Sequence, residues 1–391
     1  MSDFDIYKSY NEQVNPYSEG KKNLGSRADK KTRYYMYEKC KGNITLNEKE
    51  RHSIELLKMA LRRSKKPSVS CSFGIDSIVS LYLTRKALSE LDIDPSDIDV
   101  VWNNTLNEFP ETRMYAKKIM DLWNLRLHQT KPKKSLKQVI DDHGGVDSSY
   151  FFSRKGDRRE GRPLSEKCCA VLKHEPMHRA MKELNFDLIV VGIRADESSQ
   201  RKIAGLRDGE FFYSTTEWKS FVVRPILYWT EEDVWNYVKK EKIPYNDVYN
   251  NNMIKTYPKN IKEIVKKYQQ ELVELGIDVD QLANEQIQTV NRWQSIFLKK
   301  IGFKMFTPRV GCMMCPIPVK YGYLKWIRTY YPKVYEGMIY KLGYGKVLLE
   351  MIPDDVKQEI EFVLNIDLSA ENAHEYLKEI LEAKPCTFDK F

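Results

Sequence analysis

The sequence predicts an α/β fold, a parallel sheet flanked by helices, with an all-α C-terminal extension. Between residues 46 and 250, short apolar runs alternate with segments whose apolar positions recur at helical spacing. Such alternation is typical of strand–helix–strand units that build a parallel sheet. After residue 250 only helical patterns recur, and 391 residues suffice for a main domain plus an accessory region.

Three regions are expected along the chain. Residues 1–45 are polar and rich in Tyr and Lys, and they form an N-terminal extension. Residues 46–250 form the alternating α/β domain. Residues 251–391 form a helical insertion and C-terminal region that contributes the second of two cysteine pairs.

The expected elements follow from the apolar periodicity. The strands are 67–72, 98–103, 125–130, 187–192 and 221–226. The helices of the α/β domain are 46–64, 76–91, 110–123, 166–184 and one that begins after Thr230, a good N-cap residue. The later helices are 259–275, 278–300, 319–331, 333–343, 345–351, 353–364 and 369–383.

Composition and charge narrow the class of protein. No run approaches the roughly 18 apolar residues that span a membrane. The N-terminus lacks the pattern of a secretory signal, so a cytoplasmic location without a membrane partner is expected. The formal net charge of +9 favours an anionic partner, such as a nucleotide or a nucleic acid, although Lys-rich solvated helices would give the same balance.

The loop between the first strand and its helix carries small polar residues in the stretch SCSFGIDSIVS, residues 70–80. A loop of this kind, at the N-terminus of a helix, presents backbone N–H groups and a positive dipole end to phosphate. Ser72, Gly74 and Ser77 are the candidates for phosphate contact. Asp76 is unfavourable beside phosphate unless a cation is near or it caps the helix. An ordinary helix cap is the alternative for the whole stretch.

Four of the seven cysteines fall into two tight pairs, Cys168-Cys169 and Cys312-x-x-Cys315. An odd number of cysteines in an intracellular context argues against structural disulfides. Four thiolates could hold zinc or an iron–sulfur cluster, and an adjacent pair is unusual for zinc. Cys40 and Cys71 are interpreted as small core residues.

Six segments occur in a characteristic order: Ser72-Phe-Gly-Ile-Asp-Ser, Asn104-Thr-Leu-Asn-Glu-Phe-Pro-Glu-Thr, Cys168-Cys-Ala-Val-Leu-Lys-His-Glu-Pro-Met, Gly192-Ile-Arg-Ala-Asp-Glu-Ser-Ser-Gln-Arg, Arg224-Pro-Ile-Leu-Tyr-Trp and Gly311-Cys-Met-Met-Cys-Pro. This set resembles the phosphoadenosine phosphosulfate (PAPS) reductase family, within the PP-loop adenine-nucleotide α-hydrolases. The resemblance extends over residues 66–318. It implies a Rossmann-like (HUP/PP-loop) sheet and makes residues 46–250 an adenine-nucleotide-binding domain.

The resemblance also implies roles for single residues. Nucleotide binding, to ATP, adenylylsulfate (APS) or PAPS and with Mg²⁺ as a further ion, is assigned to Ser72, Phe73, Gly74, Ser77 and Arg201. Catalytic roles are assigned to Asp76, Lys173 and Arg194. The cysteine pattern is similar to that of APS reductases, which implies that Cys168, Cys169, Cys312 and Cys315 ligate a [4Fe–4S] cluster. Lys173, four residues after Cys169 on the same helical face, would contact the anion of the nucleotide and tune the cluster.

The chain departs from the family pattern at several positions. Phe73 and Ile75 stand where ATP-cleaving members have Gly and Lys, as in sulfonucleotide reductases, yet Asp76-Ser77 is kept. Asn104 and Leu106 replace the Asp and Gly of the second motif. The Glu-Cys-Gly-x-His context of the reductase tail nucleophile is absent, which leaves Cys386, near the C-terminus, as the candidate. The insertion before Cys312 resembles those of sulfur-inserting members, including DNA phosphorothioation enzymes of the Dnd type.

Three hypotheses for the function follow. The favoured one is an iron–sulfur transferase that uses ATP to incorporate sulfur into a nucleic acid, with a sulfur-donor protein such as a cysteine desulfurase. The second is an oxidoreductase that converts APS or PAPS to sulfite with a thioredoxin-like reductant. The third is a non-catalytic, redox-sensing cluster protein that binds DNA. The basic loop 154–162 is expected to face the site.

Overall fold

The computed structural model describes residues 44–146, 164–214, 219–350 and 354–368, with residues 34, 37, 38, 376, 377 and 379 in addition. The chain divides into two compact units. The first comprises Met1–Asn104, Pro110–Lys131 and Glu175–Asn246, and the second comprises Thr105–Phe109, Pro132–His174 and Asp247–Phe391. This division differs from the expected single boundary after residue 250, because the second unit also includes the earlier segments Thr105–Phe109 and Pro132–His174. Most of the expected N-terminal extension, 1–45, lies outside the described residues.

The first unit is built on a six-stranded sheet with the strand order β3-β2-β1-β4-β6-β5. Its strands are β1 (Pro67–Ser70), β2 (Asp99–Asn103), β3 (Arg126–Thr130), β4 (Leu188–Val191), β5 (Phe211–Ser214) and β6 (Ser220–Val223). Strands β1, β2, β3, β4 and β6 pair in parallel, with Ser68 opposite both Asp99 and Ile189. The chain runs from β1 outward to β3 and then returns to β4 on the other side of β1. The order therefore reverses between β1 and β4, where open α/β sheets usually bind ligands.

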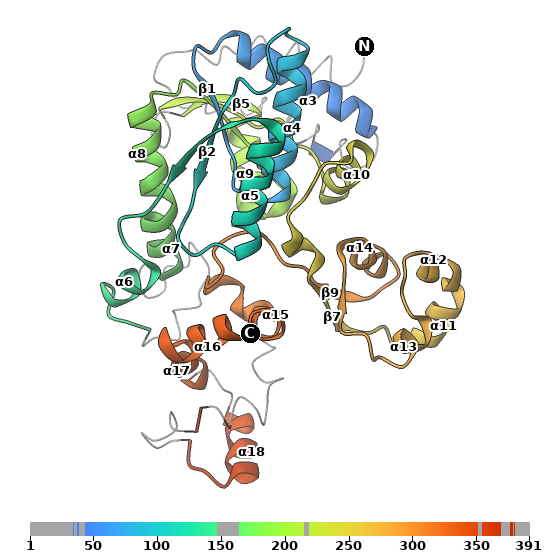
Figure 1. The fold of residues 1–391 in the computed structure, drawn as a ribbon. Coiled ribbons are helices and arrows are strands. Elements are labelled where there is room, and N and C mark those ends of the chain that lie inside the picture. The colour runs from blue at the N-terminus through green and yellow to red at the C-terminus, as the bar shows by residue number, and fades with distance from the viewer. Residues whose placement is uncertain are drawn as a thin grey trace. The chain divides into compact units, whose positions relative to one another are not determined.

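Helices cover both faces of this sheet, as Figure 1 shows, with α8 on one side and α3, α4 and α5 on the other. The bounds are α3 (Leu46–Arg62), α4 (Ile75–Ser89), α5 (Pro110–Trp123), α8 (Glu175–Leu184), α9 (Ser199–Asp208) and α10 (Glu231–Glu241). Met177, Ala180 and Met181 of α8 pack on the strand residues Val101, Ile189, Val191 and Val222. The predicted parallel sheet flanked by helices is confirmed.

The expected capping residue of α10 is also confirmed. The Thr230 hydroxyl accepts a hydrogen bond from the Asp233 N–H at 3.1 Å, and the Asp233 carboxylate accepts one from the Thr230 N–H at 2.7 Å. This reciprocal capping box satisfies two N–H groups that would otherwise lack partners. The sequence analysis missed two elements of this unit, helix α9 and strand β5, which pairs antiparallel with β6 at the sheet edge.

The second unit contains a small sheet, so the expectation of helices only after residue 250 was wrong at three places. Strands β7 (Asn252–Thr256), β8 (Thr289–Val290) and β9 (Lys304–Phe306) form an antiparallel sheet in the order β8-β7-β9. The predicted helix 278–300 is interrupted by β8. Glu285 has a left-handed backbone (φ 59°) and Asn291 caps a new helix, so the chain leaves and re-enters helical geometry there.

The helices of the second unit pack into two cores. One core contains Leu272, Leu282, Leu298 and Phe303 from the segment around the small sheet. The other surrounds Trp326, which is fully buried. The helices are α6 (Leu136–Asp141), α7 (Leu164–Cys169), α11 (Ile261–Lys267), α12 (Gln269–Glu274), α13 (Val279–Ala283), α14 (Arg292–Lys300), α15 (Tyr323–Tyr330), α16 (Pro332–Glu336), α17 (Tyr344–Glu350) and α18 (Asp354–Leu364). Within the described ranges, no helix combines the length and apolar character that crossing a membrane requires.

The predicted helix 166–184 is not a regular α-helix. It consists of α7, a π-helical turn η2 (Ala170–His174) and α8. A π turn carries an extra residue, so Lys173 does not share a regular α-helical face with Cys169, as had been expected. The predicted helix 369–383 and the basic loop 154–162 lie outside the described residues, apart from residues 376, 377 and 379.

Candidate functional site

The loop after β1 has an unusual backbone at Phe73. This residue has φ of 59°, in the left-handed region that favours glycine. Its ring is fully buried and meets the ring of Trp102 edge-on, with centroids 5.2 Å apart. Packing therefore offsets the strain of the left-handed backbone. The assignment of Phe73 to nucleotide binding is limited by this burial, because only its backbone could contact a ligand.

Hydroxyl groups fix the next residues of the loop. Gly74 is the N-cap of α4 and has no side chain to cap it. Ser77, which is buried, donates a hydrogen bond to the Gly74 carbonyl at 2.8 Å, and its oxygen lies 3.3 Å from the hydroxyl oxygen of the exposed Ser72. Ser72 is thus the hydroxyl of this loop that solvent or a ligand can reach directly, whereas Ser77 holds the turn in shape.

Cys71 belongs to the core beneath the same loop. Its side chain is 1% exposed, and its sulfur lies 3.6 Å from the Ser77 hydroxyl. Burial raises the pKa of the Cys71 thiol to about 11, so the thiol stays protonated and unreactive at neutral pH. This agrees with its interpretation as a small core residue.

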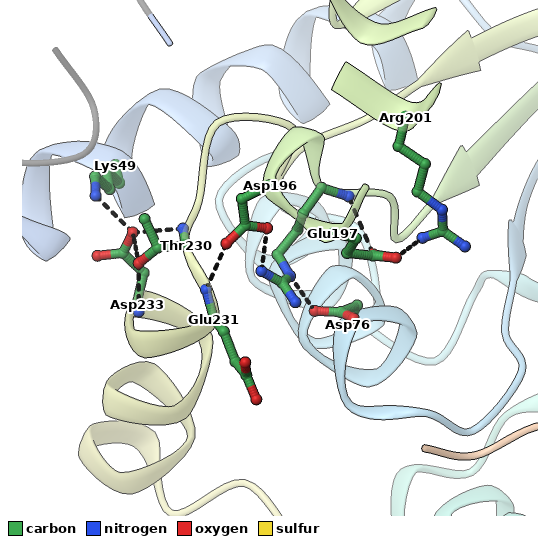
Figure 2. A network of polar contacts seen from close by, with 9 residues as sticks. Lys49, Asp76, Asp196, Glu197, Arg201, Thr230, Glu231 and Asp233 are labelled. Atoms are coloured by element: carbon green, nitrogen blue, oxygen red, sulfur yellow. Dashed lines mark hydrogen bonds and ion pairs between the residues drawn. The ribbon is translucent and has the colours of Figure 1, made fainter. Parts of the chain in front are cut away.

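A buried ion pair joins the loop after β4 to the first turn of α4 (Figure 2). The Arg194 guanidinium donates through Nε to Asp76 Oδ1 at 2.6 Å and through Nη1 to Asp196. Asp196 in turn accepts a hydrogen bond from the Glu231 N–H at 3.0 Å, at the start of α10. Burial opposes the charge of Arg194, but the carboxylates of Asp76 and Asp196 raise its pKa. Arg194 is therefore a permanently charged centre at the carboxyl ends of β1 and β4.

The second predicted arginine lies on α9. The side chain of Arg201 is 46% exposed and is paired with Glu197, one turn earlier, whose side chain is only 7% exposed. Glu197 also accepts a hydrogen bond from the Arg194 backbone N–H at 3.4 Å. Glu197 therefore contacts both candidate arginines, Arg201 through its side chain and Arg194 through its backbone N–H, and Figure 2 labels the pair of Glu197 and Arg201.

Gly192 is a residue of this region that the sequence reasoning did not single out. A Cβ atom at this position would lie 2.5 Å from the Asp76 carbonyl oxygen and 2.7 Å from the Ser77 Cα. Real side chains do not tolerate such distances to backbone, so the close approach of the β4 loop to α4 requires glycine. The signal was present, because Gly192 directly follows the aliphatic run of a buried strand.

The four paired cysteines lie together in the second unit. Cys168, Cys169, Cys312 and Cys315 line one cavity together with Lys173 and Asn107. Cys168 and Cys169 end α7, Lys173 lies on the π turn, and the other two cysteines lie between β9 and η5 (Ile317–Tyr321). The segments that carry the two cysteine pairs are therefore brought to one place.

Hydrogen bonds hold the loop between Cys312 and Cys315. Met313 N–H donates to the Asn107 carbonyl at 2.6 Å, Met314 N–H donates to Asn107 Oδ1 at 3.3 Å, and the Tyr344 hydroxyl donates to the Met314 carbonyl at 2.6 Å. Tyr323 donates to the Met313 carbonyl. The Cys312 sulfur lies 3.4 Å from the Thr105 hydroxyl. Asn107, Thr105 and both tyrosines were not predicted as site residues.

Burial keeps the Cys168 and Cys315 thiols of the cavity protonated at neutral pH. Burial, together with the neighbouring cysteines, raises the pKa of Cys168 and of Cys315 to about 12. Burial also raises the pKa of Cys312, although Lys173 works in the opposite direction. The charge of Cys312 is the largest cause of the raised pKa of Lys173, which is therefore protonated. One lysine cannot balance four thiolates, so further positive charge is needed before all four can ionise.

The chemistry of the donors fits a metal–sulfur group. Four thiols are soft ligands of the kind that iron–sulfur clusters use. Asn107 Nδ2 is buried and lacks a hydrogen-bond partner within the described chain. Among the described residues, no group of three or more His, Cys, Asp or Glu side chains is arranged so that it could hold a metal ion. Cys386 and Cys40 lie outside the described residues.

Comparison with known proteins shows to which family this chain belongs. Residues 66–318, well over half of the chain, match the phosphoadenosine phosphosulfate reductase domain. The chain therefore belongs to the PAPS reductase family, as its motifs indicated.

Two curated relatives are named adenosine 5'-phosphosulfate reductase. The one from Oceanobacillus iheyensis is 26% identical over 182 residues, which are 46% of this chain and 65% of the relative, just under two thirds of its length. The one from a Geobacillus strain is 28% identical over 196 residues, 50% of this chain and 72% of the relative.

The similarity to solved structures is weaker than the similarity to these relatives. A PAPS reductase from Candida auris, in a phosphate complex, has a TM-score of 0.37 and 20% identity, and the match covers 55% of this chain and 89% of that one. A U34-tRNA thiolase from Methanococcus maripaludis with its [4Fe–4S] cluster has a TM-score of 0.35 and 15% identity, with 64% and 79% of the two chains covered.

Proposed function

We propose that this chain is an iron–sulfur enzyme that binds an adenine nucleotide and performs sulfur chemistry. The observation that carries the proposal is the cavity in which Cys168, Cys169, Cys312 and Cys315 come together with Lys173. In a family of sulfonucleotide enzymes, four cysteines around one cavity are the ligand set of a [4Fe–4S] cluster. When bound, such a cluster supplies redox-active iron and sulfide. Lys173 contributes a positive charge that offsets the thiolates.

The nucleotide would bind at the carboxyl ends of β1 and β4. The Ser72 hydroxyl is exposed there, next to the N-terminus of α4, which favours phosphate through its dipole and N–H groups. Asp76 would repel phosphate if it were alone, but Arg194 at 2.6 Å neutralises it. The exposed guanidinium of Arg201 would exchange its pairing with Glu197 for an anionic group of the ligand. In this arrangement Arg194 positions the loop and Arg201 reaches the ligand.

The reaction we favour is ATP-dependent incorporation of sulfur into a nucleic acid. An acceptor oxygen of the nucleic acid would attack the α-phosphate of ATP and release pyrophosphate. The outer sulfur of a persulfide on the donor protein would then attack the activated centre and displace AMP. A dithiol reductant would cleave the resulting S–S bond, which leaves the sulfur on the nucleic acid and frees the donor thiol. Two features of the sequence support it: the retained Asp76-Ser77 pair and the net charge of +9. Mg²⁺ would accompany ATP, as it commonly bridges substrate phosphates.

Reduction of APS or PAPS to sulfite is the second candidate. Curated relatives at 25–28% identity carry the name adenosine 5'-phosphosulfate reductase. Phe73 also stands at a position where sulfonucleotide reductases have phenylalanine and ATP-cleaving members have glycine. In this reaction a thiolate, with Cys386 as the candidate, would attack the sulfur of the sulfonucleotide and release the adenosine phosphate. A thioredoxin-like dithiol would then free sulfite and regenerate the thiol.

The test is incubation of anaerobically purified protein with ATP, APS or PAPS in separate reactions. Pyrophosphate release that depends on a nucleic acid supports sulfur incorporation, and sulfite release supports the reductase. If an iron-containing protein released neither product, the result would support the non-catalytic DNA-binding alternative and overturn our proposal.

Ser77→Ala should weaken nucleotide binding, because the Ser77–Gly74 hydrogen bond shapes the loop. Ser96→Ala is the matched control, because Ser96 bonds to Asp94 in the turn beyond the other end of α4.

A further inference from the structure

Asn107 occupies an unusual place beside the cysteine cavity. The residue is 7% exposed, and it lines the cavity together with the four cysteines. It comes from the short segment Thr105–Phe109, which belongs to the second unit. The parts of the chain immediately before and after this segment in the sequence belong to the first unit. Glu108, the next residue, forms an isolated antiparallel bridge with Cys312. The backbone on which Asn107 sits is therefore joined directly to the cysteine loop.

The orientation of the Asn107 amide follows from its contacts. Oδ1 accepts a hydrogen bond from the Met314 N–H at 3.3 Å. If the amide were reversed, its NH₂ group would face another N–H donor, which is unfavourable. The contact therefore shows that the amide oxygen faces the Met314 N–H and that the amide nitrogen is the other end of the group. The backbone carbonyl of Asn107 also accepts from the Met313 N–H at 2.6 Å. Two hydrogen bonds thus hold the residue against the loop between Cys312 and Cys315.

The nitrogen end of the amide lacks a partner. Nδ2 is buried, and no described residue accepts a hydrogen bond from it. A buried donor that stays unpaired costs about 1–3 kcal/mol, so such a group in a native fold calls for an acceptor. The acceptors available from a metal–sulfur group in this cavity are thiolate and sulfide sulfur atoms.

We propose that Asn107 donates an N–H···S hydrogen bond to the sulfur of the bound cluster and thereby raises its reduction potential. The inference rests on the proposed [4Fe–4S] cluster and adds to it a positioning residue outside the four ligands. A hydrogen bond to thiolate or sulfide withdraws electron density from the iron, so it stabilises the reduced state more than the oxidised state. The same residue also fixes the loop that carries two ligands.

The test compares variants that distinguish the side-chain NH₂ donor of Asn107 from the hydrogen bond that its Oδ1 accepts from the Met314 N–H. Asn107→Asp keeps an oxygen for the Met314 N–H but has no donor, and Asn107→Leu removes both groups at similar volume. Tyr344→Phe is the control, because it removes a hydrogen bond to the same loop, to the Met314 carbonyl, without removing a donor that lines the cavity. The measurements are iron content, the midpoint potential, and the Fe–S stretching frequencies by resonance Raman spectroscopy in H₂O and D₂O.

We expect the Fe–S stretching frequencies of the wild type to shift in D₂O. Both Asn107 variants should lose part of that shift and have lower midpoint potentials than the wild type. The potential of Asn107→Asp should be the lowest, because aspartate adds a negative charge. Tyr344→Phe should keep the wild-type potential. Unchanged potential and deuterium shift in an iron-loaded Asn107→Leu or Asn107→Asp protein would overturn this inference alone. An equal shift in Tyr344→Phe would also overturn it, since loop position would then be the cause. A wild type without iron would overturn the proposed function and this inference together.

Discussion

Arg194 Nε lies 2.6 Å from Asp76 Oδ1, and this ion pair joins the loop after β4 to the first turn of α4. The two residues lie 118 positions apart in the chain. They meet because β1 and β4 are neighbours whose carboxyl ends share one edge of the sheet. The pair explains how an aspartate can stand in the loop that we propose to bind phosphate, because its charge is already balanced by a buried arginine.

Replacement of Arg194 should destabilise the first unit. Arg194→Ala leaves Asp76 and Asp196 close together in a largely buried place, and breaking such a pair costs about 3 kcal/mol. Urea unfolding, followed by circular dichroism, measures the loss. Arg126→Ala is the matched control, because Arg126 is 62% exposed, pairs with Asp97, and should contribute less than about 1 kcal/mol. Equal effects of the two variants would contradict the buried role of Arg194.

Gly192→Ala should disturb the loop that we propose to bind the nucleotide. The added Cβ would lie 2.5 Å from the Asp76 carbonyl oxygen, so the start of α4 must move away from β4. Weaker binding of adenine nucleotide, measured by calorimetry, is expected together with a lower melting temperature. Gly337→Ala serves as the control, since a Cβ at Gly337 meets no atom within 4 Å and its backbone φ is −61°. Wild-type nucleotide affinity in Gly192→Ala would show that the loop does not form the binding site.

The sequence predicted most of the first unit because its signals are local. Thr230 caps α10 and the aliphatic run before Gly192 forms β4, each within one or two residues of the expected position. Strand β5 was missed because four residues at an antiparallel edge carry little periodicity. The break of helix 278–300 had a local signal in the capping box of Asn291 and Gln294, but apolar spacing across it concealed the break.

The cysteine site could be predicted only in part. The motif identified its four thiols and Lys173, because all five residues lie in two short segments. Asn107 could not be identified in this way, since its role depends on contact with Met313 and Met314, which are more than 200 positions away. The left-handed backbone of Leu106 (φ 63°) explains why a family pattern has glycine there, but it gives no sign of the neighbouring donor.

Loss of a cluster ligand should remove both colour and stability. The wild type, purified without oxygen, should be brown and contain about four irons. Cys312→Ser should lose the colour and unfold at lower denaturant concentration, because cluster binding is coupled to folding. Cys71→Ala is the control, since Cys71 is a buried cysteine of the first unit that does not line the cavity. A colourless wild type with one zinc per chain would contradict the cluster.

The last prediction concerns Cys386 and separates the two candidate reactions. Deletion of residues 385–391 removes this thiol and leaves every described site residue in place. If sulfur is incorporated with ATP, the truncated protein should still release pyrophosphate, because no step of ATP cleavage uses a tail thiol. If the protein is a reductase of the tail-thiol type, truncation should abolish sulfite formation while nucleotide binding persists, because attack on sulfur requires a delivered thiolate. Cys386→Ser in the full-length chain is the matched control for loss of the tail itself. We expect pyrophosphate release to survive in both variants, and full loss of a sulfite-forming activity in both would overturn the preference for sulfur incorporation.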